Sequence, residues 1–102
     1  MVPSKSILPL LNQIGSSIQM DINKLISEGI KSLLLQKRNA LMLDKMYIQS
    51  KYSNMSKNEL EYKIELGEID EHPAWEDIIL LENIDSELEK FDEYIENISR
   101  ST

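Results

Sequence analysis

The pattern of hydrophobic and polar positions predicts a helical chain in which one helix dominates. Apolar residues recur through residues 21–52 and include three runs, at 33–35, 41–43 and 46–48. A one-sided surface helix carries a single apolar stripe of roughly 100°, whereas these runs spread apolar groups around most of the circumference. We therefore predict one long helix over about residues 21–52, with Asp21 as its N-cap, that is buried on more than one side.

Gly29 interrupts this helix in sequence. A glycine inside a helix destabilises it by up to about 1 kcal/mol relative to alanine, so we expect a structural reason for Gly29. Either another helix approaches closely at Gly29, or the helix breaks there. If it is unbroken, the helix is roughly 48 Å long at 1.5 Å per residue, which is long for a chain of 102 residues.

The clearest local signal is a capping box at Ser56 and Glu59, which starts a short helix over about residues 57–66. Gly67 follows, and glycine suits the left-handed position beyond a helix end. Pro73 is favoured at the first position of the next helix, predicted over about residues 73–98. Its apolar residues repeat every three or four positions, as in a helix-pairing seam: Trp75, Ile78, Leu81, Ile84, Leu88, Phe91, Ile95 and Ile98.

Residues 1–20 leave two alternatives open. A short helix that starts near Pro9 and stops at Gly15 has the usual order of proline early and glycine late. Pro9 disfavours a central strand through residues 7–11, because proline cannot donate to the ladder. Alternation of apolar and polar residues over 17–20 instead fits an edge strand. A strand followed by helices is the order of ribbon-helix-helix DNA-binding dimers, but Gln19 is the one side chain there suited to base edges.

Together these elements predict an all-α protein with a single helical domain over residues 1–102 and an N-terminal arm over residues 1–20. We expect the long helix to pair with the C-terminal helix as a hairpin or bundle, and the surplus of apolar surface predicts an oligomer.

Charge is distributed unevenly along the chain. Residues 1–55 hold seven Lys and Arg against three Asp and Glu, and residues 56–102 hold four against fifteen, within a net charge of −7. An acidic half repels phosphate, so nucleic-acid binding is not expected. The acids are either the solvated face of a helix or an arm that steers a basic partner. The chain has no cysteine, no apolar run of about 20 residues and no signal-peptide pattern, so we expect a cytoplasmic protein without a membrane span.

Candidate chemistry is sparse. His72 is the single histidine and is expected at the surface or in a helix cap, since a general base needs a positioned partner. The acids around it lack the ordered spacing of a calcium loop: Glu68, Asp70, Glu71, Glu76 and Asp77. No phosphate loop, GxSxG or HExxH motif is present. We predict no catalytic residues, no cofactor and no metal.

Residues 51–81 carry a resemblance. The run KYSNMSKNELEYKI, followed by Gly67-Glu68 and then HPAWED, resembles small archaeal and bacterial antitoxin-like proteins with a "KYGMS-EE-F" element after a long helix. Ser53-Asn54 stands where that element has glycine. The resemblance implies an acidic helical protein that masks a toxin in a two-gene toxin–antitoxin pair.

The function expected from the sequence is a non-enzymatic, antitoxin-like protein–protein interaction module. The predicted interface residues are Leu34, Leu41, Tyr47, Ile48 and Trp75. Trp75 has a second interpretation, as the anchor of the C-terminal helix on the short helix. The alternative functions are a structural homo-oligomer and, with Lys24, Lys31, Lys37, Arg38 and Lys45 as its basic face, a small DNA-binding regulator.

Overall fold

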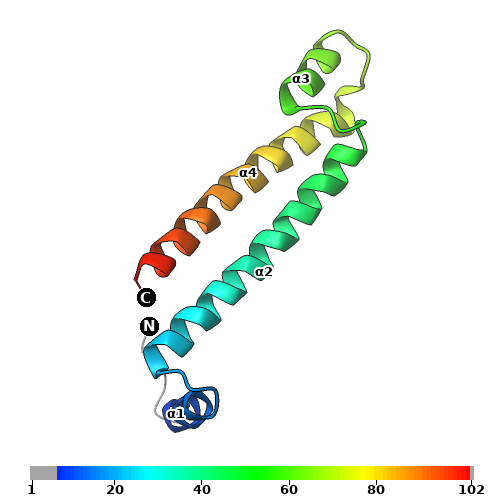
Figure 1. Cartoon of the computed structure of the whole chain (residues 1–102). Coiled ribbons are helices and arrows are strands. Elements are labelled where there is room, and N and C mark those ends of the chain that lie inside the picture. The colour runs from blue at the N-terminus through cyan, green and yellow to red at the C-terminus, as the bar shows by residue number, and fades with distance from the viewer. Residues whose placement is uncertain (1–6, 102) are drawn as a thin grey trace.

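Two long antiparallel helices form the body of the molecule (Figure 1). The computed structural model describes residues 7–101, and these residues form four helices: α1 (Leu8–Ser17), α2 (Ile22–Ser50), α3 (Lys57–Glu65) and α4 (Glu71–Arg100). The helix α3 folds over one end of the α2–α4 hairpin, and α1 crosses α2 at the other end (Figure 1). The predicted all-α fold is confirmed, and α2 runs unbroken through Gly29.

Local signals in the sequence set the helix ends. The side chain of Asp21 accepts a hydrogen bond from the amide of Lys24 at 2.8 Å, and that of Ser56 accepts one from the amide of Glu59 at 3.1 Å. Gly67 has a φ of +76° just beyond α3, which is the left-handed conformation expected there. Each of these three predictions is confirmed.

The start of α4 is divided at His72. Helical hydrogen bonding begins at Glu71, but His72 has an extended backbone, with φ −107° and ψ 130°. The residue before a proline is pushed out of the helical region, so the continuous helix starts at Pro73, as the sequence predicts.

Within the N-terminal arm, of which residues 1–6 lie outside the described part, Leu8–Ser17 form a helix, and the edge-strand alternative is wrong. α1 continues through Ser17, two residues beyond the predicted stop at Gly15, and the chain then reverses so that the amide of Met20 donates to the Gly15 carbonyl at 2.7 Å. A Cβ on Gly15 would lie 2.5 Å from the carbonyl oxygen of Met20, so glycine is required at this reversal. Because residues 18–20 make this turn, they cannot extend as a strand.

Two buried clusters hold the helices together. Ile48 of α2 packs with Leu81, Ile84 and Leu88 of α4, and at the α3 end Leu60, Ile64, Ala74 and Ile78 form the second cluster. Tyr52 contacts both clusters. The predicted seam of α4 is therefore its buried side, with one correction: Ala74, not Trp75, faces α3. Ala74 fits there because its side chain is short enough for the two helices to approach closely.

The shape is elongated, with extents of 62 × 24 × 20 Å and a radius of gyration of 20.2 Å. A compact domain of 100 residues has a radius of gyration of about 13 Å. A two-helix body leaves the far side of each long helix without an intramolecular neighbour, so much apolar surface stays exposed. None of the helices in residues 7–101 has the length and apolar character needed to cross a bilayer.

Candidate interaction surface

The five predicted interface residues fall on different sides of the molecule. Ile48 is 4% exposed and belongs to the α2–α4 core, and Leu34 and Leu41 are half-buried. Tyr47 is 69% exposed on α2, and Trp75 is 36% exposed near the start of α4. The structure therefore brings Leu41 and Ile48 together inside the hairpin and separates them from Tyr47 and Trp75.

The inner side of α2 is matched to α4 by charge as well as by packing. Arg38 pairs with Asp92 at 2.5 Å, and Lys45 pairs with Asp85 at 2.7 Å. The two cations are seven residues apart on α2 and the two carboxylates are seven residues apart on α4, in the opposite direction, as antiparallel helices require. Two cations of α2 are thus neutralised by two carboxylates of α4, and both cations belong to the predicted basic DNA-binding face.

The outer side of α2 carries a second apolar seam. Successive residues of a helix are about 100° apart, so Leu43 lies about 200° around α2 from Leu41. A row spaced alternately three and four residues runs along this side, and we call it the outer stripe: Ile26, Gly29, Leu33, Gln36, Ala40, Leu43, Tyr47 and Ser50. None of these eight residues is charged, and all but Ile26 are exposed, with Leu33 at 54% and Leu43 at 66%. Alternate spacing of this kind is the sequence signature of a helix-pairing surface.

Gly29 lies on the outer stripe. A Cβ built on Gly29 has no atom within 4 Å, so nothing in the hairpin requires a glycine at this position. Gly29 nevertheless costs α2 up to about 1 kcal/mol relative to alanine. The sequence left two explanations for Gly29 open, a break in the helix and the close approach of another helix. Because α2 is unbroken at Gly29, the close approach of another helix is the explanation that is left.

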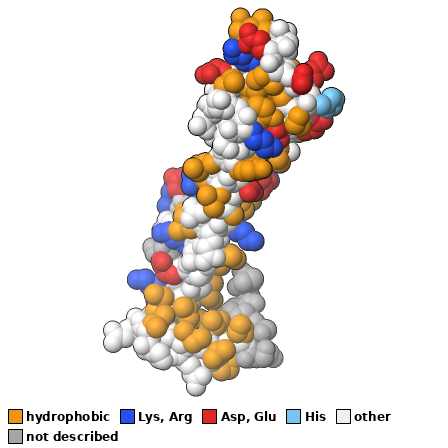
Figure 2. Space-filling model, turned by 90° about the vertical axis from the view of Figure 1, so that its right-hand side faces the viewer, with side chains coloured by type: hydrophobic (Ala, Val, Ile, Leu, Met, Phe, Trp, Pro, Cys, Tyr) orange, Lys and Arg blue, Asp and Glu red, His pale blue; other side chains and the backbone are white. Residues whose placement is uncertain are grey.

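Apolar groups also gather on α1, at the base of the same side of the molecule. Figure 2 looks onto the side formed by α2 and shows hydrophobic groups over α1 and again along the shaft above it. The exposed apolar side chains of the α1 segment are Ile7, Leu8, Leu10, Ile14 and Ile18. The residues of the outer stripe are uncharged, and Figure 2 shows Lys, Arg, Asp and Glu groups beside the apolar groups along the shaft.

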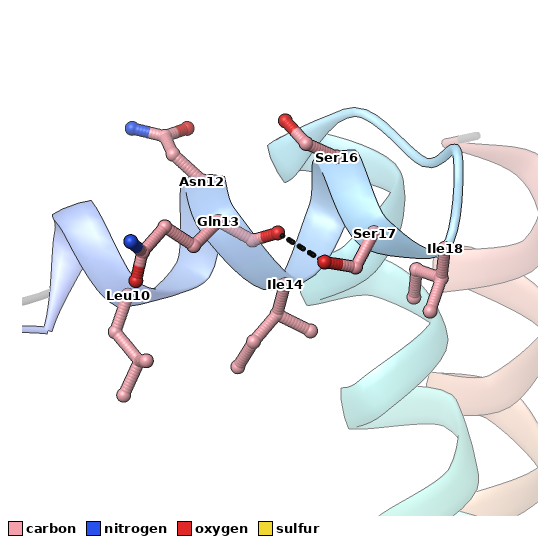
Figure 3. Close-up of a pocket in the computed structure, with 7 residues that line it drawn as sticks. All are labelled: Leu10, Asn12, Gln13, Ile14, Ser16, Ser17 and Ile18. Carbon is pink, nitrogen blue, oxygen red and sulfur yellow. Dashed lines mark hydrogen bonds between the residues drawn. The ribbon is translucent and has the colours of Figure 1, made fainter.

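The hollow on α1 is shallow and has a mixed apolar and polar lining. It has a volume of about 640 Å³ and is lined by residues of α1 and the turn after it, among them Leu10, Ile14 and Ile18. Figure 3 shows Leu10 and Ile14 on the same side of the helix, while the hydroxyl of Ser17 donates to the Gln13 carbonyl at 3.0 Å. The lining has no charged side chain, and its polar side chains are those of Asn12, Gln13, Ser16 and Ser17.

A buried polar cluster lies where α2, α3 and α4 meet. Asp77 is 8% exposed, accepts a hydrogen bond from the hydroxyl of Tyr52 and lies 3.4 Å from the ammonium of Lys51. Burial of the phenol, followed by its hydrogen bond to the Asp77 carboxylate, raises the pKa of Tyr52 from 10.0 to about 12. Tyr52 therefore stays protonated at neutral pH and acts as a donor that compensates a buried carboxylate.

The sequence pattern did not single out this cluster or the outer stripe. Asp77 was grouped with the acids near a helix start, although it sits three residues after Ala74 and four before Leu81 on the buried side of α4. The outer stripe was detectable from its alternating spacing, but which of the two apolar sides of α2 would meet α4 was not.

Comparison with known proteins places the chain in a family. A family model described as "Uncharacterized protein MJ0235 family" matches residues 1–102. The chain belongs to this family. No curated protein and no solved structure gives a significant match to it. Because the match covers residues 1–102, the sequences of α1, the hairpin and α3 all lie within the matched region.

Proposed function

We propose that the protein is a non-enzymatic protein–protein interaction module of the cytoplasm whose binding element is the outer stripe of α2. One observation carries this proposal: eight positions with helix-pairing spacing lie opposite the side of α2 that contacts α4, and seven of them are exposed. A continuous exposed row of this kind on one helix is a surface that interaction sites use.

The proposal is tested with a pair of charge-introducing variants. Leu33→Glu with Leu43→Glu places two carboxylates on the outer stripe, and both side chains are exposed, so the fold tolerates them. Leu35→Glu with Ile79→Glu is the matched control, because Leu35 and Ile79 are exposed leucine-sized residues off the stripe.

The readout is native mass spectrometry of each protein purified from its own cells, with circular dichroism as a check of helix content. We expect the wild type and the control to carry a bound polypeptide at fixed stoichiometry, whether a second copy or another protein, and the stripe variant to lose it. Equal association of all three proteins would refute the outer stripe as the binding element.

The antitoxin-like interpretation is the finer form of this proposal. It is supported by the resemblance over residues 51–81 and by the acidic C-terminal half. In this form the partner is a toxin encoded beside this protein, and binding masks the toxin. Co-expression tests it: the wild type should relieve growth arrest caused by the neighbouring gene product, and the stripe variant should not.

A DNA-binding regulator remains the second candidate, with Lys24, Lys31 and Lys37 as its cations. Arg38 and Lys45 are held by carboxylates of α4, which weakens this candidate. A gel shift that persists at physiological salt would favour it over protein binding.

A further inference from the structure

We infer that the partner of the outer stripe is a second copy of this chain, bound so that the two α2 helices run antiparallel and Tyr47 of each copy packs over Gly29 of the other. This inference rests on the proposed function, because it names the partner of the same surface.

The size pattern of the outer stripe is self-complementary in the antiparallel direction. The stripe consists of two sets of residues, each spaced by seven: Ile26, Leu33, Ala40 and Tyr47, and Gly29, Gln36, Leu43 and Ser50. In an antiparallel pair, residues of the first set on one helix face residues of the second set on the other. The register that sets Tyr47 opposite Gly29 also sets Leu33 opposite Leu43 and Ala40 opposite Gln36. The largest side chain of the stripe thus meets the position without a side chain, and two leucines meet each other.

The same register pairs the outer stripe along its whole length. The base of α2 is already in contact with α1, where Ile22, Leu25 and Ile26 are half-buried, and α2 ends at Ser50. The stretch from Ile26 to Ser50 is centred on residue 38, and the register above has its two-fold axis at the same residue. This register therefore gives every residue of the outer stripe an opposing stripe residue.

A parallel pair does not use the glycine. In a parallel, in-register pair, Gly29 faces Gly29 and leaves a gap, while Tyr47 faces Tyr47 and forces the helices apart. In the antiparallel pair Tyr47 meets Gly29, so neither the gap nor the clash arises. The pair also places no charged residue of the stripe in the contact, since the stripe has none between Ile26 and Ser50. The Gln36 amides lie near the two-fold axis, where a polar residue in a pairing seam fixes register.

The contact is small for a stable dimer. It is about 36 Å long at 1.5 Å per residue and about 10 Å wide, the spacing of packed helices, which gives about 360 Å² of flat area per chain. Standard interfaces bury about 800 Å² per partner. We therefore expect a dimer that dissociates at micromolar concentrations.

Sedimentation equilibrium between about 1 and about 100 µM tests the size complementarity. The wild type should pass from monomer to dimer. Gly29→Leu has open space in the hairpin and leucine is a better helix former than glycine, so helix content should be retained and the melting temperature should not fall. The leucine fills the place of Tyr47 and should weaken dimerisation at least tenfold. Adding Tyr47→Ala to Gly29→Leu should restore the dimer, because the large and small positions are then exchanged.

Cysteine cross-linking tests the direction, since the native chain has no cysteine. Leu33→Cys and Leu43→Cys chains, mixed and oxidised, should form a disulfide between the two variants. Each variant alone should not, because like positions are about 15 Å apart along the axis, and a disulfide requires Cα atoms within about 7 Å. Self-linking of either variant would show a parallel pair and overturn the inference.

A wild type that stays monomeric at about 100 µM would also overturn the inference. That result is distinguishable from failure of the proposed function. If Leu33→Glu with Leu43→Glu still removes a different polypeptide bound in cells, the outer stripe remains an interaction surface and the second copy is excluded as its partner.

Discussion

Replacement of Tyr52 by phenylalanine tests the polar cluster at the junction of α2, α3 and α4. The change removes one hydroxyl and keeps the ring that contacts both buried clusters. That hydroxyl donates to Asp77, which is 8% exposed and has one other partner, Lys51, at 3.4 Å. A hydrogen bond to a charged group contributes about 1.5–3 kcal/mol, so Tyr52→Phe should lower the free energy of unfolding by about that amount.

The assay is thermal unfolding at neutral pH and fixed protein concentration. For a chain of about 100 residues, 1 kcal/mol corresponds to about 4–8 °C, so we expect Tm to fall by at least about 6 °C. Tyr62→Phe is the matched control, because Tyr62 is exposed on α3, and its Tm should change little. Equal Tm values for wild type and Tyr52→Phe would refute the stabilising role of this hydrogen bond.

The same cluster predicts how the difference between the two proteins depends on pH. The pKa of Tyr52 is about 12 in the folded protein against 10.0 ordinarily, so the folded state holds the proton more tightly. Its stabilisation is complete below pH 10 and is lost as the pH rises through about 12. The stability difference between wild type and Tyr52→Phe should therefore narrow between pH 10 and pH 12, and a constant difference would contradict the assigned cause.

Two further predictions concern α3. Ser56→Ala removes the N-cap of α3 and should lower the free energy of unfolding in urea by about 1 kcal/mol. Ser56→Thr keeps the hydroxyl and should keep most of the stability. An unchanged urea midpoint in Ser56→Ala would mean that the cap does not hold the helix start. Leu60→Ala creates a cavity at a residue that is 1% exposed and should lower the free energy of unfolding by about 2–5 kcal/mol. Leu66→Ala, at an exposed leucine, should lower it by less than about 0.5 kcal/mol. Similar losses for the two variants would contradict the placement of Leu60 in the core.

Local signals in the sequence determined where the helices begin and end. Asp21, Ser56 and Gly67 act within one turn of chain, through a side-chain oxygen that accepts a backbone amide or through a left-handed backbone. Such interactions need no distant residue. For the same reason the long helix, the short capped helix and the seam of α4 could be predicted from the spacing of apolar residues.

Which face of α2 is buried was decided by the tertiary structure. Leu41 and Leu43 are equally apolar, and the sequence pattern alone ranks neither as the core residue. The choice depends on α4: carboxylates of α4 pair with cations of α2 in one antiparallel register, at Arg38 with Asp92 and Lys45 with Asp85, and that register turns Ile48 inward and Tyr47 outward. It also brings Asp77 onto Tyr52, residues 25 positions apart in the chain. Contacts between distant residues are fixed by packing of whole helices, so the buried side of α2, the polar cluster and the exposure of the outer stripe are decided only once the hairpin is closed.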